Sequence, residues 1–202
     1  MKDWTPEQTE KRRMILDAAR ELFSKEGVSN VSMRRIAAKV NYSPALIYRY
    51  VKNKEELLDQ LRTEGYQILL NRMARVDVTK DPLDHLTDLA VEYVKFGVDY
   101  WEYYDLMFHM PLQIDENGAC PIKGYEAVLD MIRTAVVRAI KAGFFKGAAP
   151  DTALFMCWGQ AHGLLSLYIS KRIPFHAGTD RAKTLLEEIP RTFLRLAATG
   201  TE

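Results

Sequence analysis

The sequence predicts an all-α protein of about nine helices, and three observations support this fold class. Apolar residues recur at steps of three and four over most of the 202 residues, which is the period of an amphipathic helix. Capping residues followed by proline stand where several of these stretches begin, and glycine stands where some of them end. No strand-like alternation or hairpin dipeptide interrupts the pattern. We expect one helical unit, or two small ones sharing a core.

The composition is that of a soluble globular protein, with 48% hydrophobic and 27% charged residues. No apolar run approaches the roughly 18 residues that span a membrane, and the N-terminus lacks the apolar region of a secretory signal. We therefore expect a cytoplasmic protein that does not bind membranes. Cys120 and Cys157 are too few for a disulfide scaffold and too far apart for a metal knuckle, so redox chemistry is not expected.

The near-neutral net charge of +1 hides an uneven distribution along the chain. Residues 1–54 hold 12 lysines and arginines against 6 acidic residues, a net charge of +6. Residues 55–202 hold 16 against 21, a net charge of −5. A basic N-terminal part on an acidic body indicates that the N-terminal part meets a polyanion.

The first three predicted helices form a helix-turn-helix. Thr5-Pro6-Glu7-Gln8 has the residues of a capping box, and Gly27 ends the apolar pattern that follows it. A second, short helix follows the capping residue Ser32. Ser43-Pro44 begins a third helix that runs to about Lys52. Two short helices joined by about three residues must cross steeply.

Another capping box, Asn53-Lys54-Glu55-Glu56, begins a long helix that runs to about Val76. The helical pattern then resumes at Asp81-Pro82 and continues to Met110, with a break near Asp99. The last three helices are expected over about 122–142, 151–171 and 180–198. We place a boundary before this long helix, with the helix-turn-helix at 1–53 and a helical body at 54–202.

The third helix carries a face suited to DNA. Ile47 and Val51, four residues apart, can face the core, whereas Ala45, Tyr48, Arg49 and Lys52 form the opposite stripe. A small residue permits close approach, arginine can fork onto a guanine edge or a phosphate, and tyrosine can reach a phosphate or a thymine methyl group. This stripe is typical of a recognition helix lying in a major groove.

The N-terminal sequence resembles the DNA-binding domain of the tetracycline-repressor (TetR) family. The resemblance covers about residues 10–60 and rests on 15–19 with Leu22-Phe23 and Gly27, on Ile36-Ala37, and on 47–57. It implies a homodimeric transcriptional regulator, usually a repressor, that a small ligand releases from a palindromic DNA operator. Half-sites about one helical turn apart are expected for such a two-fold dimer.

By position, the resemblance assigns phosphate contacts to Ser32 and Lys54 and a possible base contact to Arg34. The full set of expected DNA-binding residues is Ser32, Arg34, Ser43, Pro44, Ala45, Tyr48, Arg49, Tyr50 and Lys54. Two positions depart from the family pattern, which commonly has glycine where this chain has Asn41 and often glycine at Ala45. Asparagine tolerates a left-handed turn and alanine remains small, so we expect a changed operator preference rather than lost binding.

Seven aromatic residues lie between positions 93 and 108, with methionines nearby, and they can line a cavity for an apolar or aromatic effector or form ordinary core. The segment 158–164 resembles the Trp, His and Gly signature of a C-terminal domain in one branch of the same family. His162 can donate a hydrogen bond into a pocket or be a core histidine. The expected ligand-binding residues are Tyr93, Phe96, Tyr100, Trp101, Tyr104, Met107, Phe108, Trp158 and His162.

The resemblance also places a dimer interface on the last two long helices. The residues expected there are Leu164, Leu165, Leu186, Ile189 and Phe193.

Other interpretations of the sequence remain open. The acidic residues and the histidine at positions 81–88 can form a metal-binding face or simply complement a helix N-terminus. The body can also belong to a soluble helical carrier or enzyme for an apolar molecule, and the head to a nonspecific architectural DNA binder. We assign no catalytic residue, no metal ligand and no cofactor.

Overall fold

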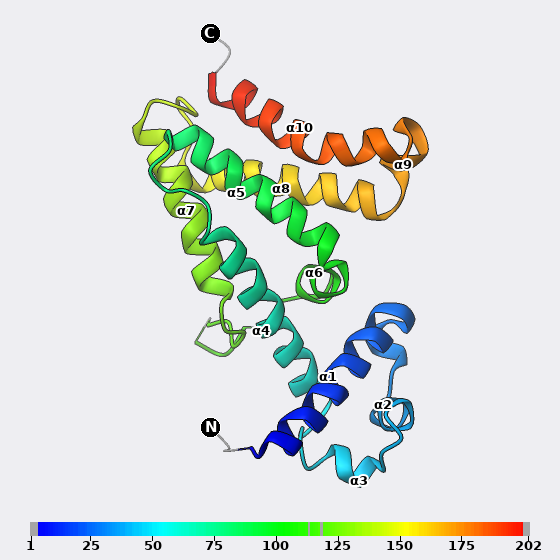
Figure 1. The fold of residues 1–202 in the computed structure, drawn as a ribbon. Coiled ribbons are helices and arrows are strands. Elements are labelled where there is room, and N and C mark those ends of the chain that lie inside the picture. Colours follow the sequence, from blue (N-terminus) through cyan, green and yellow to red (C-terminus); the bar gives the residue numbers. More distant parts are fainter. Residues whose placement is uncertain (1–3, 113, 118, 200–202) are drawn as a thin grey trace. The chain divides into compact units, whose positions relative to one another are not determined.

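The computed structural model describes residues 4–112, 114–117 and 119–199, and in these ranges the fold is all-α (Figure 1). Ten α-helices and one 3₁₀ turn are found there, against the nine helices expected. The elements are α1 (Pro6–Glu26), η1 (Val28–Asn30), α2 (Met33–Lys39), α3 (Pro44–Ile47), α4 (Lys54–Met73), α5 (Pro82–Asp99), α6 (Trp101–Phe108), α7 (Tyr125–Lys141), α8 (Pro150–Ile169), α9 (Arg172–Ala177) and α10 (Thr179–Thr199). The expected break near Asp99 is the junction of α5 and α6.

The chain forms two compact units. The first, which we call the head unit, comprises Met1–Gly65 and Glu102–Lys123, and the second, the body unit, comprises Tyr66–Trp101 and Gly124–Glu202. The contacts therefore divide the chain within α4, whereas a functional boundary was expected between residues 53 and 54. Helix α4 is unbroken across the division, so its first part belongs to the head unit and its last part to the body unit.

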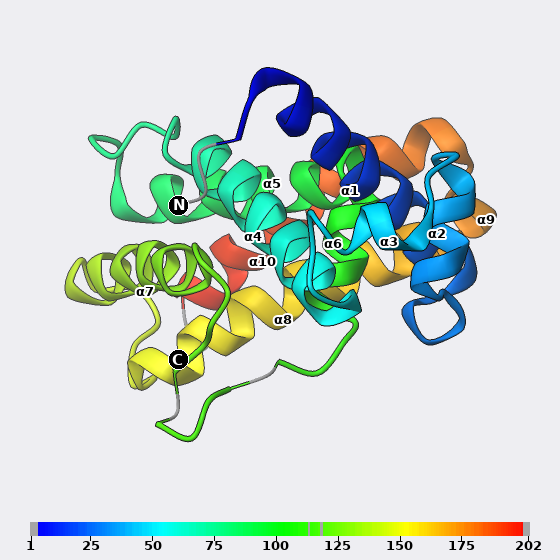
Figure 2. The same cartoon turned by 90° about the horizontal axis from the view of Figure 1, so that it is seen from below.

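The head unit is built by α1, α2 and α3 as the capping residues predict. Thr5 and Gln8 form the capping box that begins α1, and the N–H group of Gly27 closes the helix on the carbonyl of Phe23. Ser32 caps α2 and Ser43 caps α3, each by accepting a backbone N–H bond at 3.2 Å. Helix α1 packs on α2, and α2 packs on α3, which gives the expected helix-turn-helix (Figure 2).

Helix α3 is shorter than the sequence pattern predicts. It ends at Ile47 instead of about Lys52. The backbone then tightens, because the N–H groups of Arg49 and Tyr50 bond to carbonyls three residues earlier instead of four. The N–H group of Val51 still bonds to the carbonyl of Ile47 at 3.1 Å. The residues after α3 therefore continue its turn without forming a regular α-helix.

Helix α6 packs inside the head unit. Gly65 on α4 allows this close approach, because a Cβ atom there would lie 2.4 Å from the sulfur atom of Met107. The buried guanidinium of Arg62 donates from Nε to the backbone carbonyl of Leu106 over 2.9 Å. A buried arginine whose donor reaches a carbonyl at the end of another helix fixes the distance between the two helices.

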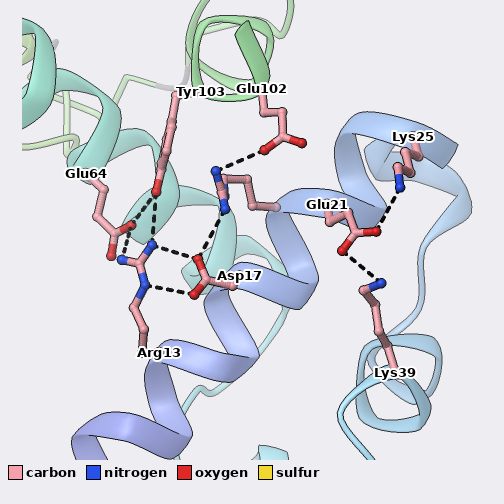
Figure 3. A network of polar contacts seen from close by, with 9 residues as sticks. Arg13, Asp17, Glu21, Lys25, Lys39, Glu64, Glu102 and Tyr103 are labelled. Atoms are coloured by element: carbon pink, nitrogen blue, oxygen red, sulfur yellow. Dashed lines mark hydrogen bonds and ion pairs between the residues drawn. The ribbon is translucent and has the colours of Figure 1, made fainter. Parts of the chain in front are cut away.

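Polar side chains also join α1, α4 and α6 (Figure 3). Arg13 on α1 contacts Asp17, Glu64 of α4 and the Tyr103 hydroxyl of α6. Tyr103 in turn donates to Glu64 over 2.9 Å. Burial raises the pKa of Tyr103, which keeps its hydroxyl protonated as a donor. This network lies entirely within the head unit.

The body unit is built around α5, which packs on α7, α8 and α10. Figure 1 shows α8 and α10 side by side. Gly97 on α5 allows the close contact with α8, because a Cβ atom there would lie 2.5 Å from a methyl group of Leu165. None of the described helices has a segment long and apolar enough to cross a membrane.

Helix α9 was not expected, because Pro174 and Gly178 suggested a loop. Lys171 adopts a left-handed conformation with φ of 60° and turns the chain after α8. Pro174 is the third residue of α9, where the N–H group that proline lacks has no partner within the helix. Gly178, with φ of 79°, ends this short helix before α10 begins.

Candidate DNA interface and ligand cluster

The outer side of α3 presents the side chains expected to meet DNA. Ile47 and Val51 are buried in the head unit. Ala45, Tyr48 and Arg49 are exposed, and Tyr48 exposes 53% of its surface although it is a large aromatic residue. An exposed aromatic ring beside an exposed guanidinium and a small residue can approach base edges and phosphates.

Four further residues expected to bind DNA are exposed, and they lie on α2, on α3 or at the residues that cap these helices. Ser32 and Ser43 are exposed caps, and Pro44 is the exposed first residue of α3. Arg34 is exposed on α2, and no hydrogen bond or ion pair of its side chain occurs among the described contacts. Its guanidinium is therefore available for an external anion or base.

Two expected DNA-binding residues are placed differently. Tyr50 exposes only 9% of its surface and stacks on Trp4 with ring centroids 5.4 Å apart, so its ring serves the packing of the head unit. The Lys54 ammonium donates to the carbonyl of Val28 over 3.0 Å. This bond holds Lys54 at the first residue of η1, where only its remaining donors can reach a phosphate.

The turn between α2 and α3 requires a left-handed residue, and Asn41 supplies it with φ of 56°. Asparagine is one of the few residues other than glycine that adopts this conformation readily. The departure from the family's glycine at this position is therefore compatible with an intact turn.

The aromatic residues proposed as ligand contacts are shared between the two units. Tyr104, Met107 and Phe108 belong to the head unit, where Tyr104 and Met107 are buried. Tyr93 and Phe96 are buried in the body unit, and Tyr100 and Trp101 expose 38% and 41% of their surfaces.

The structure does bring three of these residues together by hydrogen bonds between α5 and α8. The Tyr93 hydroxyl accepts from Trp158 Nε1 over 3.1 Å and lies 3.2 Å from His162 Nδ1. When the hydroxyl donates to Nδ1, the imidazole proton is placed on Nε2. We call Tyr93, Trp158 and His162 the Tyr93 cluster. Trp158 and His162 are half-buried, so part of each ring is accessible, and the hydrogen bonds fix the direction of the polar atoms.

Comparison with known protein families gives two matches along the chain. Residues 15–61 match the family described as "Bacterial regulatory proteins, tetR family". Residues 86–192, more than half of the chain, match "Tetracyclin repressor-like, C-terminal domain". The chain belongs to the TetR family. The description of this family is that of bacterial regulatory proteins, not of enzymes.

Curated relatives are helix-turn-helix regulators as well. YobS of Bacillus subtilis is 29% identical over 94 residues, which are 46% of this chain and 49% of YobS. SAR2658 of Staphylococcus aureus is 28% identical over 117 residues, 51% of this chain and 63% of that protein. The chain thus spans about half to two thirds of these two relatives. YhgD of Bacillus subtilis is 23% identical over 186 residues, 80% of this chain and 96% of YhgD.

Solved structures of TetR-family proteins share the fold. PfmR from Thermus thermophilus has a TM-score of 0.70 at 19% identity, covering 93% of this chain and 98% of that one. The fatty acid degradation regulator FadR from Bacillus halodurans has a TM-score of 0.71 at 19% identity, covering 96% and 97%. These likenesses establish the TetR fold of the chain.

Three of the five residues expected at a TetR-type dimer interface are buried in their own chain. Leu164, Leu165 and Leu186 expose 7% of their surfaces or less. Leu165 packs against Gly97 of α5, and all three side chains are covered within their own chain. Ile189 and Phe193 on α10 are half-buried and remain partly accessible.

A different row of residues is open on α8. Phe155, Gly159, Gly163 and Leu167 recur every four residues, and all four are exposed. Phe155 exposes 61% of its surface and Leu167 46%. A Cβ atom added at either glycine would meet nothing within 4 Å in this chain. We call this row the open α8 face.

His85, at the start of α5, faces an arginine. It exposes 7% of its surface, and its Nδ1 lies 3.4 Å from Nη1 of Arg138 on α7. Burial lowers the pKa of His85, the positive charge of Arg138 lowers it further, and Asp88 and Asp77 oppose these effects.

In the described part of the chain, no three His, Cys, Asp or Glu side chains are grouped as they would be around a metal ion. Burial also raises the pKa of the Cys157 thiol to about 12, so this thiol is protonated at neutral pH.

The His85 environment predicts a loss of stability in mild acid. Because the folded-state pKa lies below the unfolded value of 6.5, the unfolded chain takes up a proton first as the pH falls below 6.5. The contribution of the neutral imidazole is present above pH 6.5 and is lost as the pH falls through the folded pKa. The His85→Gln variant should show a weaker decline in the free energy of unfolding between about pH 7 and pH 5. Denaturant titrations at each pH measure this, with His176→Gln on the exposed end of α9 as the matched control. Parallel pH profiles for all three proteins would contradict the assignment.

Proposed function

We propose that the protein is a homodimeric, ligand-responsive repressor that binds a palindromic operator in the cytoplasm. The observation that carries the DNA contact is the exposed Tyr48 beside the exposed Arg49 at the end of α3. Because the family acts in transcription, we place the protein in the cytoplasm, the compartment that holds the chromosome. The Trp158, Gly159, His162 and Gly163 pattern supports the branch of the family with this C-terminal signature.

The open α8 face supports the dimer. Phe155 and Leu167 are apolar surfaces that water solvates poorly, and the two glycines between them permit a second helix to approach closely. On α10, Leu196 exposes 71% of its surface and extends the apolar area beside half-buried Ile189 and Phe193. A two-fold axis through this face would pair α8 and α10 with the same helices of a second copy.

The Tyr93 cluster supports an apolar or aromatic effector. Its indole and phenol rings offer flat apolar surface, while the hydroxyl and imidazole are oriented by their mutual hydrogen bonds. An effector that binds one conformation of the body better than another shifts the equilibrium toward that conformation. A coupling free energy of about 1 to 3 kcal/mol is typical of such regulation. Helix α4, continuous from Lys54 to Met73, joins the two units covalently without a flexible linker.

Selection of binding sites from random duplex DNA tests the proposed regulator. At about 0.15 M salt, where nonspecific affinity is already weakened, the purified protein should recover one palindromic consensus. The half-sites should lie about one helical turn apart. Recovery of DNA without a consensus would favour an architectural DNA binder, and an absence of palindromy would contradict the two-fold dimer.

The effector proposal predicts a specific effect of Tyr93→Phe. The substitution keeps the ring but removes the hydroxyl that Trp158 and His162 share, so a polar aromatic effector loses its oriented partners. With 1-naphthol as probe, the concentration that releases the selected operator should rise about five-fold or more, as measured by fluorescence anisotropy of labelled DNA. Tyr168→Phe on α8, the helix that carries Trp158 and His162, is the matched control. Equal midpoints for both variants, or no release by about 1 mM 1-naphthol, would count against this cluster as the effector site.

A further inference from the structure

A cavity of about 680 Å³ lies in the body unit, apart from the Tyr93 cluster. The end of α4, the turn that follows it and the outer side of α5 form its walls, and Arg191 of α10 reaches into it. Of the nine residues that the sequence suggested for ligand binding, only Tyr100 lines it. Its volume lies within the range of sites that take small molecules, about 300 to 1,000 Å³.

The polar lining of this cavity is more basic than acidic. Five lining residues are lysine or arginine, and three are acidic. Lys80 and Arg191 share Asp88, at 2.6 Å and 3.3 Å, so one carboxylate serves two cations. Arg72 and Lys95 are likewise paired, with Asp99 and Glu187 just outside the lining, so the attraction for an anion must come from a cation without such a partner.

Among the cations that line this cavity, Arg75 is the one available to pair with a ligand. It is exposed, and its guanidinium has no hydrogen-bonding or ion-pair partner among the contacts of the described residues. Arg72, one turn earlier on α4, is held in place by Glu92 at 3.1 Å and by Asp99 at 2.6 Å. An arginine fork matches the two oxygens of a carboxylate.

The rest of the lining includes apolar surface. Ile68 of α4 and Val91 of α5 contribute aliphatic surface, and Tyr100 contributes an aromatic ring. The guanidinium carbon of Arg72 lies 6.0 Å from the centre of the Tyr100 ring, which places positive charge beside this aromatic surface. The cavity thus combines an apolar wall with a cation that has no internal partner among the described residues.

We propose that this cavity is a second ligand site that binds a small organic monoanion, a carboxylate joined to an aromatic ring or short hydrocarbon chain. The carboxylate pairs with Arg75, and the apolar part lies against Ile68, Val91 and Tyr100. This site is independent of the Tyr93 cluster, and it does not depend on DNA binding or dimerisation.

Fluorine NMR with 4-(4-fluorophenyl)butanoate tests the proposal on the full chain, with the neutral 4-(4-fluorophenyl)butanamide as the matched probe. The wild-type protein should bind the carboxylate at least about ten-fold more tightly than the amide, since a charge-assisted bond is lost with the amide. Arg75→Gln should weaken carboxylate binding by about ten-fold or more and leave amide binding unchanged. Arg133→Gln, on the exposed side of α7 and outside the cavity, should leave both affinities unchanged.

A second variant tests the location by occupying the space. Asn71→Phe replaces an exposed lining residue on α4 and should block the carboxylate probe, while Tyr93→Phe should leave its affinity unchanged. Circular dichroism melting checks that each variant is folded. Equal carboxylate affinity in wild type and Arg75→Gln, no preference for the carboxylate over the amide, or no detectable carboxylate binding would overturn the proposal.

Discussion

Replacing Tyr48 by alanine is expected to lower affinity for the selected operator by about ten-fold or more. The ring exposes 53% of its surface at the end of α3 and packs little within the head unit, so its removal should not unfold the protein. A lost contact to a base edge or phosphate typically costs about 1 to 3 kcal/mol, which corresponds to this change in affinity. Fluorescence anisotropy with labelled operator DNA measures it.

Two comparisons make the Tyr48 result specific. Tyr48→Phe separates the hydroxyl from the ring, because a phosphate contact requires the hydroxyl and contact with a thymine methyl group requires only the ring. Thermal unfolding and the sedimentation of Tyr48→Ala should match those of the wild type. Unchanged operator affinity in a folded Tyr48→Ala protein would remove this residue from the interface.

The Gly163→Arg variant is expected to be a folded monomer that no longer binds the full operator tightly. A Cβ atom at Gly163 meets nothing within 4 Å in its own chain, and a helix-interior glycine costs about 0.5 to 1 kcal/mol relative to alanine. The substitution should therefore leave the single chain as stable as before, or slightly more stable. A long charged side chain on the open α8 face would however prevent a second helix from approaching. Sedimentation equilibrium should give the chain mass of 23.2 kDa for the variant and twice that mass for the wild type.

Operator affinity should fall together with dimerisation in Gly163→Arg, by about 100-fold or more, because each protomer then binds a half-site alone. Ala127→Arg is the matched control, since it adds the same side chain to an exposed helical position on α7. If Gly163→Arg remains a dimer, the interface lies on another face of the body unit.

Local sequence signals predicted the head unit well because its helix ends are set by local chemistry. A capping side chain bonds to an amide two or three residues away, so Thr5, Ser32 and Ser43 could be recognised as helix starts without knowledge of the fold. The family pattern has glycine at position 41, and Asn41, a residue type that tolerates a left-handed turn, adopts one. The end of α3 was predicted less well, because the turn after Ile47 is fixed by burial of Tyr50 and Val51.

The ligand residues show the opposite situation. Aromatic density suggested a group between Tyr93 and Phe108, and the contacts assign its residues to two units, an assignment that has no local signature in the sequence. The contact of Arg62 with α6 was not predicted. A single arginine inside an apolar helix face could have drawn attention to it, but the carbonyl of Leu106 that accepts the hydrogen bond has no sequence signature. The cavity beside Arg75 was not predicted either, since its walls come from α4, α5 and α10.

The all-α fold class, the helix-turn-helix and the resemblance to the TetR family can be recognised from the amino-acid sequence, because helical period, capping and turn residues act over a few positions. Which side chains remain on the surface depends on tertiary packing. Leu165 fits the space over Gly97, so it belongs to the core of its own chain, whereas Phe155 on the same helix is exposed. Both are apolar residues on one helix, and what separates them is packing between segments far apart in the chain, which no local pattern encodes.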